Sequence, residues 1–438
     1  MQEHNLYVGA GKGVILFPEE MFPTAEGYNK IHDNPHARIV LMECATGRYA
    51  FAHLELNNIF ETGTEKVLEV IRQETGIEHD RVFFHCLHVL ETPHPEPPMK
   101  KGPEAEHFNG LFFGAVEQAM RDACRQAMGR MCPARVGADY AVCATCNTNR
   151  NVLTEDGWWL GSGEAEPCDK SVAVVRFEDL EGNPIAVLFT YNSQSSIMDM
   201  SRGEDGSRYV TADFAGASAA FVEGQFEGCV AMYCTGAGGD GCPSFQAKRN
   251  VLGAGGKLWS VDLHEAGFIL VELLGERLGS VVVQCAEKIR CRDEAEIKAV
   301  HGSVDFGGRP RIPLKDVVPS KSFNLEGDGS VKTMEPAVLA IGKDIVLVGV
   351  MAEICAITEM KIKEQSAFPF TAVMTFSQMG NYGGKGMGKY MGEKEMYEKI
   401  TFQAMNSGVV AGSAEHLCDY LTGYLDQVRE GKEGFCAE

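Results

Sequence analysis

Hydrophobic and polar residues follow two periods along the chain, one typical of β-strands and one typical of α-helices. Strands are predicted where short apolar runs end at glycine, proline or asparagine, and helices where apolar residues recur every three or four positions. The predicted strands cover residues 7–16, 37–43, 49–56, 81–90, 172–177, 185–191, 230–234, 297–304, 338–350 and 371–378. The predicted helices cover residues 64–75, 108–128, 211–223, 262–291, 353–364 and 415–428. This order predicts an α/β fold in which helices flank mixed β-sheets.

The chain shows no repeat and no low-complexity linker, so we expect one domain over residues 1–438. A stretch rich in glycine, proline and charge, residues 301–335, marks the seam at which that domain would divide into two lobes. No apolar run reaches the roughly 20 residues of a membrane span, and the first residues lack the basic and apolar segments of a signal peptide. We therefore expect a cytoplasmic protein that does not enter a membrane.

Composition narrows the range of partners. Hydrophobic residues make up 45% of the chain and charged residues 23%, as in soluble globular proteins. The net charge of −21 excludes nonspecific nucleic-acid binding, which needs a cationic face, and disfavours docking on anionic membranes. The 15 cysteines are scattered through apolar runs, which is typical of reduced thiols in a cytoplasm. A small-molecule substrate remains the expected partner, and composition leaves the oligomeric state open.

A glycine-rich bend follows one predicted strand and is the first candidate binding element. Gly236, Gly238 and Gly239 lack side chains, so the backbone at this bend can approach a ligand closely. Asp240 ends the bend, and its carboxylate either serves chemistry or caps a neighbouring element. A second glycine-rich segment, residues 383–388, is either a hinged lid or a plain flexible loop.

Two further candidate residues stand where predicted strands end. His88 lies near the end of the strand at 81–90, and period-two alternation puts it on the same face as Cys86. A histidine there, before a loop that carries His94, either binds a metal or is a satisfied structural histidine. Glu353 follows a very apolar strand, where active sites of open α/β sheets lie, although a carboxylate there can also cap the next helix.

Nucleophilic catalysis has weaker support in the sequence. The GxSxG elbow of serine hydrolases is absent from the chain. A cysteine nucleophile at Cys234 or Cys242 would need a histidine such as His88 beside it, which only the fold can provide. Asp213 precedes a helix rich in small residues and is typical of a helix N-cap.

Several sequence blocks occur in an order that resembles one known family. They include LYVGAGKGVILFPEEM, CLHVLETP, NTNRNV, EPCDKSVAVVRFEDLEGNPIAVLF, TADFAGASAAF, GAGGDGCP and DIVLVGVMAE. In this order they resemble the catalytic domain of the neutral or alkaline, non-lysosomal ceramidases, over nearly the whole chain. The resemblance implies that family's mixed α/β fold, here without the immunoglobulin-like domain that follows it in true ceramidases.

The resemblance also implies a metal site that this chain has altered. The related ceramidases are zinc-dependent amide hydrolases whose metal is held by two histidines, a glutamate and a tyrosine. His88 and Glu353 match the first histidine and the glutamate. Asn192 replaces the second histidine, and Phe402 stands in the place of the tyrosine. Gln403 follows Phe402 where the family has a glutamate.

These substitutions leave two outcomes open for the metal. An amide oxygen is a poor zinc ligand and a phenyl ring is none, so His88 and Glu353 alone would bind zinc weakly. In the first outcome, zinc or another divalent metal is held with added ligands from His94, Cys86 or Asp240. In the second, the pocket is kept and the metal is lost.

The leading hypothesis is a hydrolase that acts on an amide-type C–N bond of a small polar metabolite rather than on ceramide. His88 and Glu353 would bind a metal or transfer protons, and Asn192 with the backbone of the glycine bend would stabilise the oxyanion. Asp240 is expected to assist the chemistry, and Gly236 stands where ceramidases have a serine. The residues expected to contact the substrate are Gly236, Gly238, Gly239, Phe402, Gln403 and His94. Two alternatives stay open, namely a non-catalytic small-molecule-binding protein of this fold and a metal-free lyase or isomerase.

Overall fold

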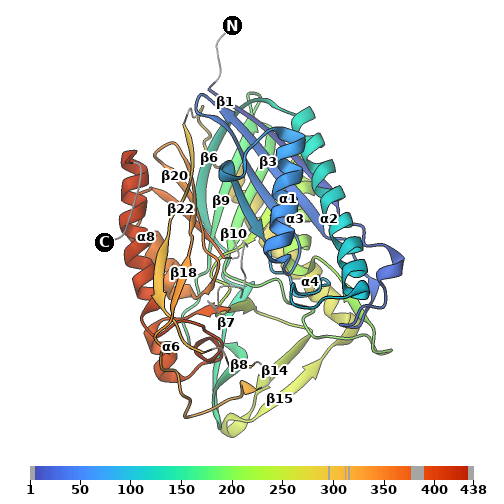
Figure 1. Ribbon diagram of the computed structural model, residues 1–438, viewed down its shortest axis with the longest axis vertical. Coiled ribbons are helices and arrows are strands. Elements are labelled where there is room, and N and C mark those ends of the chain that lie inside the picture. The colour runs from blue at the N-terminus through green and yellow to red at the C-terminus, as the bar shows by residue number, and fades with distance from the viewer. Residues whose placement is uncertain (1–4, 294–295, 311, 314–315, 376–388, 433–438) are drawn as a thin grey trace.

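The structure is a computed structural model that describes residues 5–293, 296–310, 312–313, 316–375 and 389–432. Two β-sheets pack face to face, and helices cover the outer face of each sheet (Figure 1). The predicted α/β fold with mixed sheets and flanking helices is confirmed. The glycine-rich segment 383–388 and the end of the strand predicted at 371–378 lie outside the described residues.

The larger sheet has eight strands within the described part of the chain, in the order β12-β10-β9-β6-β1-β3-β4-β5. Their bounds are β1 Leu6–Val14, β3 His36–Cys44, β4 Gly47–Leu54, β5 Val82–Cys86, β6 Cys132–Val142, β9 Ser171–Asp179, β10 Pro184–Tyr191 and β12 Val230–Thr235. Neighbours pair antiparallel, except for the parallel pairs β4–β5 and β10–β12 at the two edges. The two edges meet at one end, where Thr235 Oγ1 donates to Leu87 O at 3.0 Å. Twist that accumulates from strand to strand brings these ends together.

The smaller sheet has the order β16-β19-β20-β22 and packs on one face of the larger sheet. Its strands are β16 Ile297–His301, β19 Ala337–Ile341, β20 Ile345–Gly349 and β22 Phe370–Met374. The prediction of a single strand at 338–350 is wrong, because β19 and β20 form a hairpin there. Gly342 lies in the turn of this hairpin with a φ of +60°. Both strands are buried along their whole length, so one unbroken apolar run concealed the turn.

Helices α1 and α2 cover one half of the larger sheet, α3 and α4 the other half, and α8 packs with α5 on the smaller sheet (Figure 1). The α-helices are α1 Phe60–Thr75, α2 Pro103–Gly129, α3 Asp213–Gln225, α4 Gly267–Ala286, α5 Ala356–Gln365, α6 Lys394–Lys399, α7 Phe402–Met405 and α8 Ser413–Glu430. Short 3-10 turns are η1 Glu19–Met21, η2 His79–Arg81, η3 Ala254–Gly256 and η4 His264–Ala266. The helix predicted at 262–291 starts later, at Gly267, because the residues up to Asp262 form a strand.

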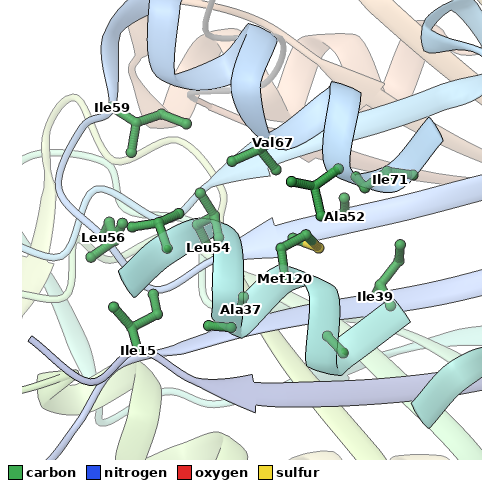
Figure 2. Close-up of a cluster of buried hydrophobic side chains, with 14 of the residues drawn as sticks. Ile15, Ala37, Ile39, Ala52, Leu54, Leu56, Ile59, Val67, Ile71 and Met120 are labelled. Atoms are coloured by element: carbon green, nitrogen blue, oxygen red, sulfur yellow. The ribbon is translucent and has the colours of Figure 1, made fainter. Parts of the chain in front are cut away.

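Apolar side chains fill the space between α1, α2 and the larger sheet (Figure 2). Ile39 and Ala52 on β3 and β4 lie in one buried cluster with Val67 and Ile71 of α1 and Met120 of α2. Complete burial of a side chain the size of valine, isoleucine or methionine stabilises the folded state by roughly 1.5–3 kcal/mol. The contacts at this interface therefore hold the two helices on the sheet. Among the residues that the structure describes, no helix is long and apolar enough to cross a bilayer.

Short strands form small sheets and hairpins beside the two large sheets, and several of them border the candidate site. They are β2 Tyr28–Ile31, β7 Asn147–Thr154, β8 Gly157–Gly163, β11 Arg208–Val210, β13 Gly241–Pro243, β14 Lys248–Leu252, β15 Leu258–Asp262, β17 Val304–Gly307, β18 Val331–Met334, β21 Glu353–Ile354 and β23 Tyr390–Met391. In Figure 1, β7, β8, β14 and β15 lie at the lower end of the molecule. The hydrophobic pattern missed most of them because they are short or carry polar, half-exposed residues.

Candidate active site

His88 and Glu353 lie far apart in the sequence and meet in the fold. The distance between His88 Nε2 and Glu353 Oε1 is 3.6 Å, and both side chains are buried. His88 follows β5 by two residues, and Glu353 forms β21 by pairing with Tyr390 of β23. The structure therefore brings together the two residues that the sequence singled out as metal ligands or proton carriers.

The backbone holds His88 in an uncommon conformation. Its φ of +61° lies in the left-handed region, which is rare for a residue with a side chain and is often found at functional sites. The predicted strand alternation does not reach it, because β5 ends at Cys86. Its Nδ1 lies 3.0 Å from Asn57 O. Because a carbonyl only accepts hydrogen bonds, we assign the proton to Nδ1, which leaves the Nε2 lone pair facing Glu353.

The surroundings of His88 keep its imidazole neutral. Burial lowers the pKa of His88 well below its usual value, and the positive charges of Lys389 and Arg150 act in the same direction. A neutral Nε2 that faces a carboxylate is suited to accept a proton or to bind a cation.

Polar and positively charged groups surround the Glu353 carboxylate. Gln194 Nε2 donates to Oε2, and Arg150 Nη2 lies 3.7 Å from the same oxygen. Lys389 Nζ lies 4.0 Å from Oε1. The Tyr390 hydroxyl hydrogen-bonds with Glu353 and Arg150, and burial raises its pKa so that it keeps its proton. These groups offset the cost of burying a carboxylate.

Arg150 links the glycine bend to the site. Its Nε and Nη2 donate to Gly239 O at 3.1 and 2.6 Å, and its Nη1 donates to Gln194 Oε1 at 3.1 Å. Its guanidinium carbon lies 5.2 Å from the ring centre of Tyr390 and 5.9 Å from that of Phe402. These contacts hold the guanidinium in one orientation, so it is a fixed donor within the site.

A cavity of about 220 Å³ borders the site, and Arg150 and Gln194 belong to its lining. Other walls come from β8 and from the β14–β15 hairpin. Cys242 also lines the cavity, but burial raises the pKa of its thiol to about 12. A thiol with that pKa stays protonated near neutral pH, which argues against Cys242 as the nucleophile.

Asn192 lies against Gly236. Neither Oδ1 nor Nδ2 of Asn192 has a hydrogen-bond partner within the described residues, although both atoms are buried. A Cβ on Gly236 would collide with Asn192 Oδ1 and would lie 2.8 Å from Glu359 Oε2. Asn192 and Gly236 therefore fit as a pair, and an unpartnered buried carboxamide needs a water, an ion or a ligand to explain it. Two residues further along, Gln194 is the one that contacts Glu353.

Asp213 anchors the segment that follows Asn192. The structure corrects its expected N-cap role, because Asp213 is itself the first residue of α3. Its carboxylate accepts from Ile197 N at 3.0 Å and from Met198 N at 2.8 Å. These bonds tie the start of α3 to the chain just beyond Asn192 and Gln194.

The glycine bend does not offer its amides to a ligand, so the backbone oxyanion site expected there is wrong. A tertiary or local contact already uses each amide, with Gly236 N donating to Tyr191 O, Ala237 N to Glu359, Gly238 N to Gly236 O and Gly239 N to Ile354 O. Glycine is required at Gly239 for a different reason, since a Cβ there would lie 2.7 Å from Glu353 O. The bend serves close packing against β21.

Asp240 and Gln403 hold the bend in place. Asp240 accepts from Ala356 N at 2.8 Å, at the start of α5, and from Asn149 Nδ2 at 3.0 Å. Burial raises the pKa of Asp240. Gln403 Nε2 donates to Gly239 O at 3.0 Å. These contacts give both residues a positioning role around the bend.

The residues expected to complete a metal site make other contacts. His94 Nδ1 pairs with Glu26 in a different cavity of about 410 Å³. Cys86 Sγ donates to Leu56 O at 3.3 Å, and burial raises its pKa to about 12. Asp240 caps α5. A ligand set rebuilt from these residues is therefore not what the fold assembles.

Tyr390 supplies the phenol beside Glu353. Phe402, which the resemblance placed at the tyrosine position, lies edge-on to Tyr390 with ring centres 5.7 Å apart and to Trp159 with ring centres 5.5 Å apart. The resemblance did not point to Tyr390, whose hydroxyl hydrogen-bonds with Glu353 and whose residue is the β23 register partner of Glu353.

Sequence reasoning missed four residues beside the Glu353 carboxylate, namely Arg150, Gln194, Lys389 and Tyr390. Arg150 lies in the block NTNRNV, and Gln194 lies in the same segment as Asn192, so both blocks were noted without a role for these side chains. Tyr390 follows a glycine-rich segment and belongs to a two-residue strand, so no periodic signal was available for it.

A second histidine cluster consists of His53, His85 and Cys234. His53 and His85 are register partners on β4 and β5, and their Nδ1 atoms lie 3.0 Å apart. One candidate ligand atom from each of the three residues lies within 4.8 Å of the others, and all three are fully buried. Burial lowers the pKa of His53 to about 3 and that of His85 well below its usual value, so both rings are neutral.

Both clusters contain donors that suit a divalent metal. His88 Nε2 and the Glu353 carboxylate are protein ligands of the kinds found in catalytic zinc sites, and the Tyr390 hydroxyl hydrogen-bonds with that carboxylate. The 3.6 Å between Nε2 and Oε1 is longer than a hydrogen bond and is close to the separation of two ligands on one ion. His53, His85 and Cys234 offer two imidazoles and a thiol, a softer set that also suits zinc.

Comparison with solved structures identifies the fold class. The neutral ceramidase from Pseudomonas aeruginosa matches 100% of this chain with 76% of its own, at a TM-score of 0.72 and 14% sequence identity. A ceramidase complexed with C2 matches 100% of this chain with 77% of its own, at a TM-score of 0.71 and 13% identity. No protein-family model and no curated protein sequence matches the chain. The chain thus has a divergent neutral-ceramidase-like fold, as the sequence blocks implied.

Proposed function

We propose that the chain is a hydrolase that cleaves an amide-type C–N bond of a small polar metabolite. The observation that carries this proposal is the meeting of His88 and Glu353 at 3.6 Å, beside a fixed guanidinium and a polar cavity. The fold adds support, because both similar structures are ceramidases. The substitution at Asn192 and the small cavity favour a metabolite over ceramide.

His88 is the proton carrier in this proposal. With Nδ1 held by Asn57 O, Nε2 takes a proton from the attacking water and later returns it to the leaving nitrogen. Glu353 stabilises the imidazolium that forms between these steps. The water oxygen bonds to the carbonyl carbon, the C–N bond breaks, and the products are a carboxylic acid and an amine.

Side chains, rather than the glycine bend, stabilise the oxyanion. Arg150 and Gln194 both line the cavity. The N–H groups of the Arg150 guanidinium and the Gln194 amide that are not used by Gly239, Gln194, Tyr390 and Glu353 can donate to a carbonyl oxygen placed there. One preorganised donor of this kind contributes roughly 3–4 kcal/mol to transition-state stabilisation. Phe402 and Tyr390 support the guanidinium by packing against it.

In an alternative route, a divalent metal bound by His88 and Glu353, with the Tyr390 hydroxyl beside them, would polarise the substrate carbonyl and lower the pKa of a bound water. His88 Nε2 would then be a metal ligand and not the proton carrier. Metal at His53, His85 and Cys234 would instead lie in the core and stabilise the fold. Zinc is our first candidate for either place, and the two places are separable by mutation.

Metal analysis of the purified chain distinguishes the two places. The variants are His88→Ala and Cys234→Ala, with Cys229→Ala as a control for loss of a buried thiol just before β12. Metal lost only in His88→Ala assigns it to the candidate active site, and metal lost only in Cys234→Ala assigns it to the core. No bound metal, and no affinity for added Zn²⁺, would refute metal-assisted hydrolysis and leave the proton-transfer route.

Turnover of a panel of small amides tests the activity itself. Glu353→Gln and His88→Ala should abolish turnover, while the exposed residue His416 provides a control in His416→Ala. Hydrolysis that survives both site variants would contradict the proposed residues. Absence of turnover for every amide, with retained ligand binding, would favour a non-catalytic binding protein.

A further inference from the structure

The cavity beside Arg150 and Gln194, here called the Lys248 cavity, has a basic lining. Lys248 and Arg249 of β14 contribute to it together with Arg150. Asp199 is the one carboxylate among the described residues that line it. A chain whose net charge is −21 therefore places three cations and one anion around this cavity.

Two of these cations are available to a ligand. Among the residues that the structure describes, the Lys248 ammonium makes no hydrogen bond and no direct ion pair, and its charge acts on the carboxylates of Asp199 and Asp262 from a longer distance. Arg249 Nη1 donates to Gln246 O at 3.2 Å, which leaves its other N–H groups for a ligand. Arg150 differs, because Gly239 O and Gln194 already occupy three of its donor contacts.

The size of the Lys248 cavity limits its occupant. Its volume is about 220 Å³. Pockets for drug-sized ligands usually measure about 300–1,000 Å³. The cavity is therefore of a size that suits a small metabolite or one polar group of a larger molecule.

We propose that the Lys248 cavity binds the anionic group, a carboxylate or a phosphate, of a small amide substrate through Lys248 and Arg249. This inference rests on the hydrolase function proposed above. Ammonium and guanidinium groups bind such oxygens through charge-assisted hydrogen bonds, and a local basic lining attracts an anion that the rest of the chain repels. With its anion at β14, the substrate would extend its amide toward Arg150 and Gln194, which contact Glu353.

Calorimetric titration of the full chain with matched probes tests the anion site. N-acetylglycine and its neutral counterpart N-acetylglycinamide differ in one charge, and inorganic phosphate tests the alternative anion. We expect at least one of the two anions to bind roughly tenfold or more tightly than the amide, and added salt to weaken only the anions. The tighter anion identifies the group that the cavity prefers.

A double variant, Lys248→Met with Arg249→Met, should lower the affinity for the preferred anion by roughly tenfold or more and leave N-acetylglycinamide unchanged. Lys257→Met is the matched control, because Lys257 is an exposed lysine in the turn of the same hairpin and does not line the cavity. Equal affinity for anions and amide, unchanged anion affinity in the double variant, or no measurable anion binding at millimolar concentration would each overturn the proposal.

The same variants separate this proposal from the hydrolase function. Anion binding that depends on Lys248 and Arg249, without turnover of any amide, would uphold the anion site and contradict the hydrolase. Turnover of anionic amides that the double variant leaves unchanged would uphold the hydrolase and contradict the anion site.

Discussion

The two buried histidine clusters use the same side chain in opposite surroundings. The His88 cluster combines an imidazole with the Glu353 carboxylate and the Arg150 guanidinium, and Arg150 also lines the Lys248 cavity. The cluster of His53, His85 and Cys234 is fully buried, and both of its imidazoles are neutral.

This contrast shows that burial alone does not identify a functional histidine. Both clusters hold neutral rings, but only the first places a base within 4 Å of a carboxylate and next to residues that line a cavity. Chemistry requires such partners because charge develops during reaction and must be stabilised where it forms. A cluster without ionised partners or access is better suited to packing or to a structural metal.

The largest expected effect on stability follows from removing the negative charge of Glu353 in the first cluster. Glu353→Ala leaves Arg150 and Tyr390 without their shared carboxylate partner, which should lower the free energy of unfolding by roughly 3–5 kcal/mol. Urea unfolding measures it. An Arg150→Met, Glu353→Ala double variant should recover part of the loss, and a single-variant cost below about 1 kcal/mol would show that the carboxylate is not held as described.

The next effect is a pH dependence from the second cluster. Because the pKa of His85 is depressed in the folded state, the unfolded chain binds its proton below pH 6.5 while the folded chain does not. Stability should therefore fall as pH drops below 6.5. His85→Gln should reduce that slope by about 1.4 kcal/mol per pH unit in urea unfolding. His416→Gln, at an exposed site, should leave the slope unchanged, and an unchanged slope in His85→Gln would refute the prediction.

A third prediction concerns the fit of Asn192 against Gly236 near the first cluster. Gly236→Ala should lower the free energy of unfolding by about 2 kcal/mol, since the new Cβ collides with Asn192 Oδ1. Asn192→Ala should relieve part of this cost, so a double-mutant cycle should give a favourable coupling. Gly110→Ala on α2 serves as control, because its Cβ meets open space. Simple additivity of the two site variants would contradict the pairing.

The smallest expected effect separates Tyr390 from Phe402. Tyr390→Phe removes a hydrogen bond to charged groups and should cost about 1.5 kcal/mol in stability and lower kcat in the amide assay. Phe402→Leu removes only ring packing and should leave kcat within about twofold. A larger loss of kcat in Phe402→Leu than in Tyr390→Phe would show that Phe402, and not Tyr390, has the functional role.

Much of the fold was predictable because long apolar runs carry a clear period. The strands of β1, β3, β4, β9 and β10 and the helices α1, α2 and α8 were located to within a few residues. The hairpin of β19 and β20 was not, because both strands are buried throughout and read as one run. Short strands such as β14 and β21 were missed because a few residues define no period.

The candidate site was predictable only in part. His88 and Glu353 were found because they stand near the ends of apolar strands, although that signal did not say that they meet. Tyr390, Gln194 and Arg150 were missed as their partners because each reaches Glu353 through contacts between distant segments. The oxyanion site predicted at the glycine bend was wrong for the same reason. The sequence did not show that the amides of the bend hydrogen-bond within the folded protein.

By itself, the sequence determined the α/β class, the main strands and helices, the acidic net charge and two of the residues at the candidate site. Only the tertiary structure decided that Tyr390 supplies the phenol, that Asp240 caps α5, and that Lys248 stands at a basic cavity. The physical reason is that apolar periodicity acts along the chain over one or two turns, whereas the charge, hydrogen bonds and burial of a site depend on segments that meet only after folding.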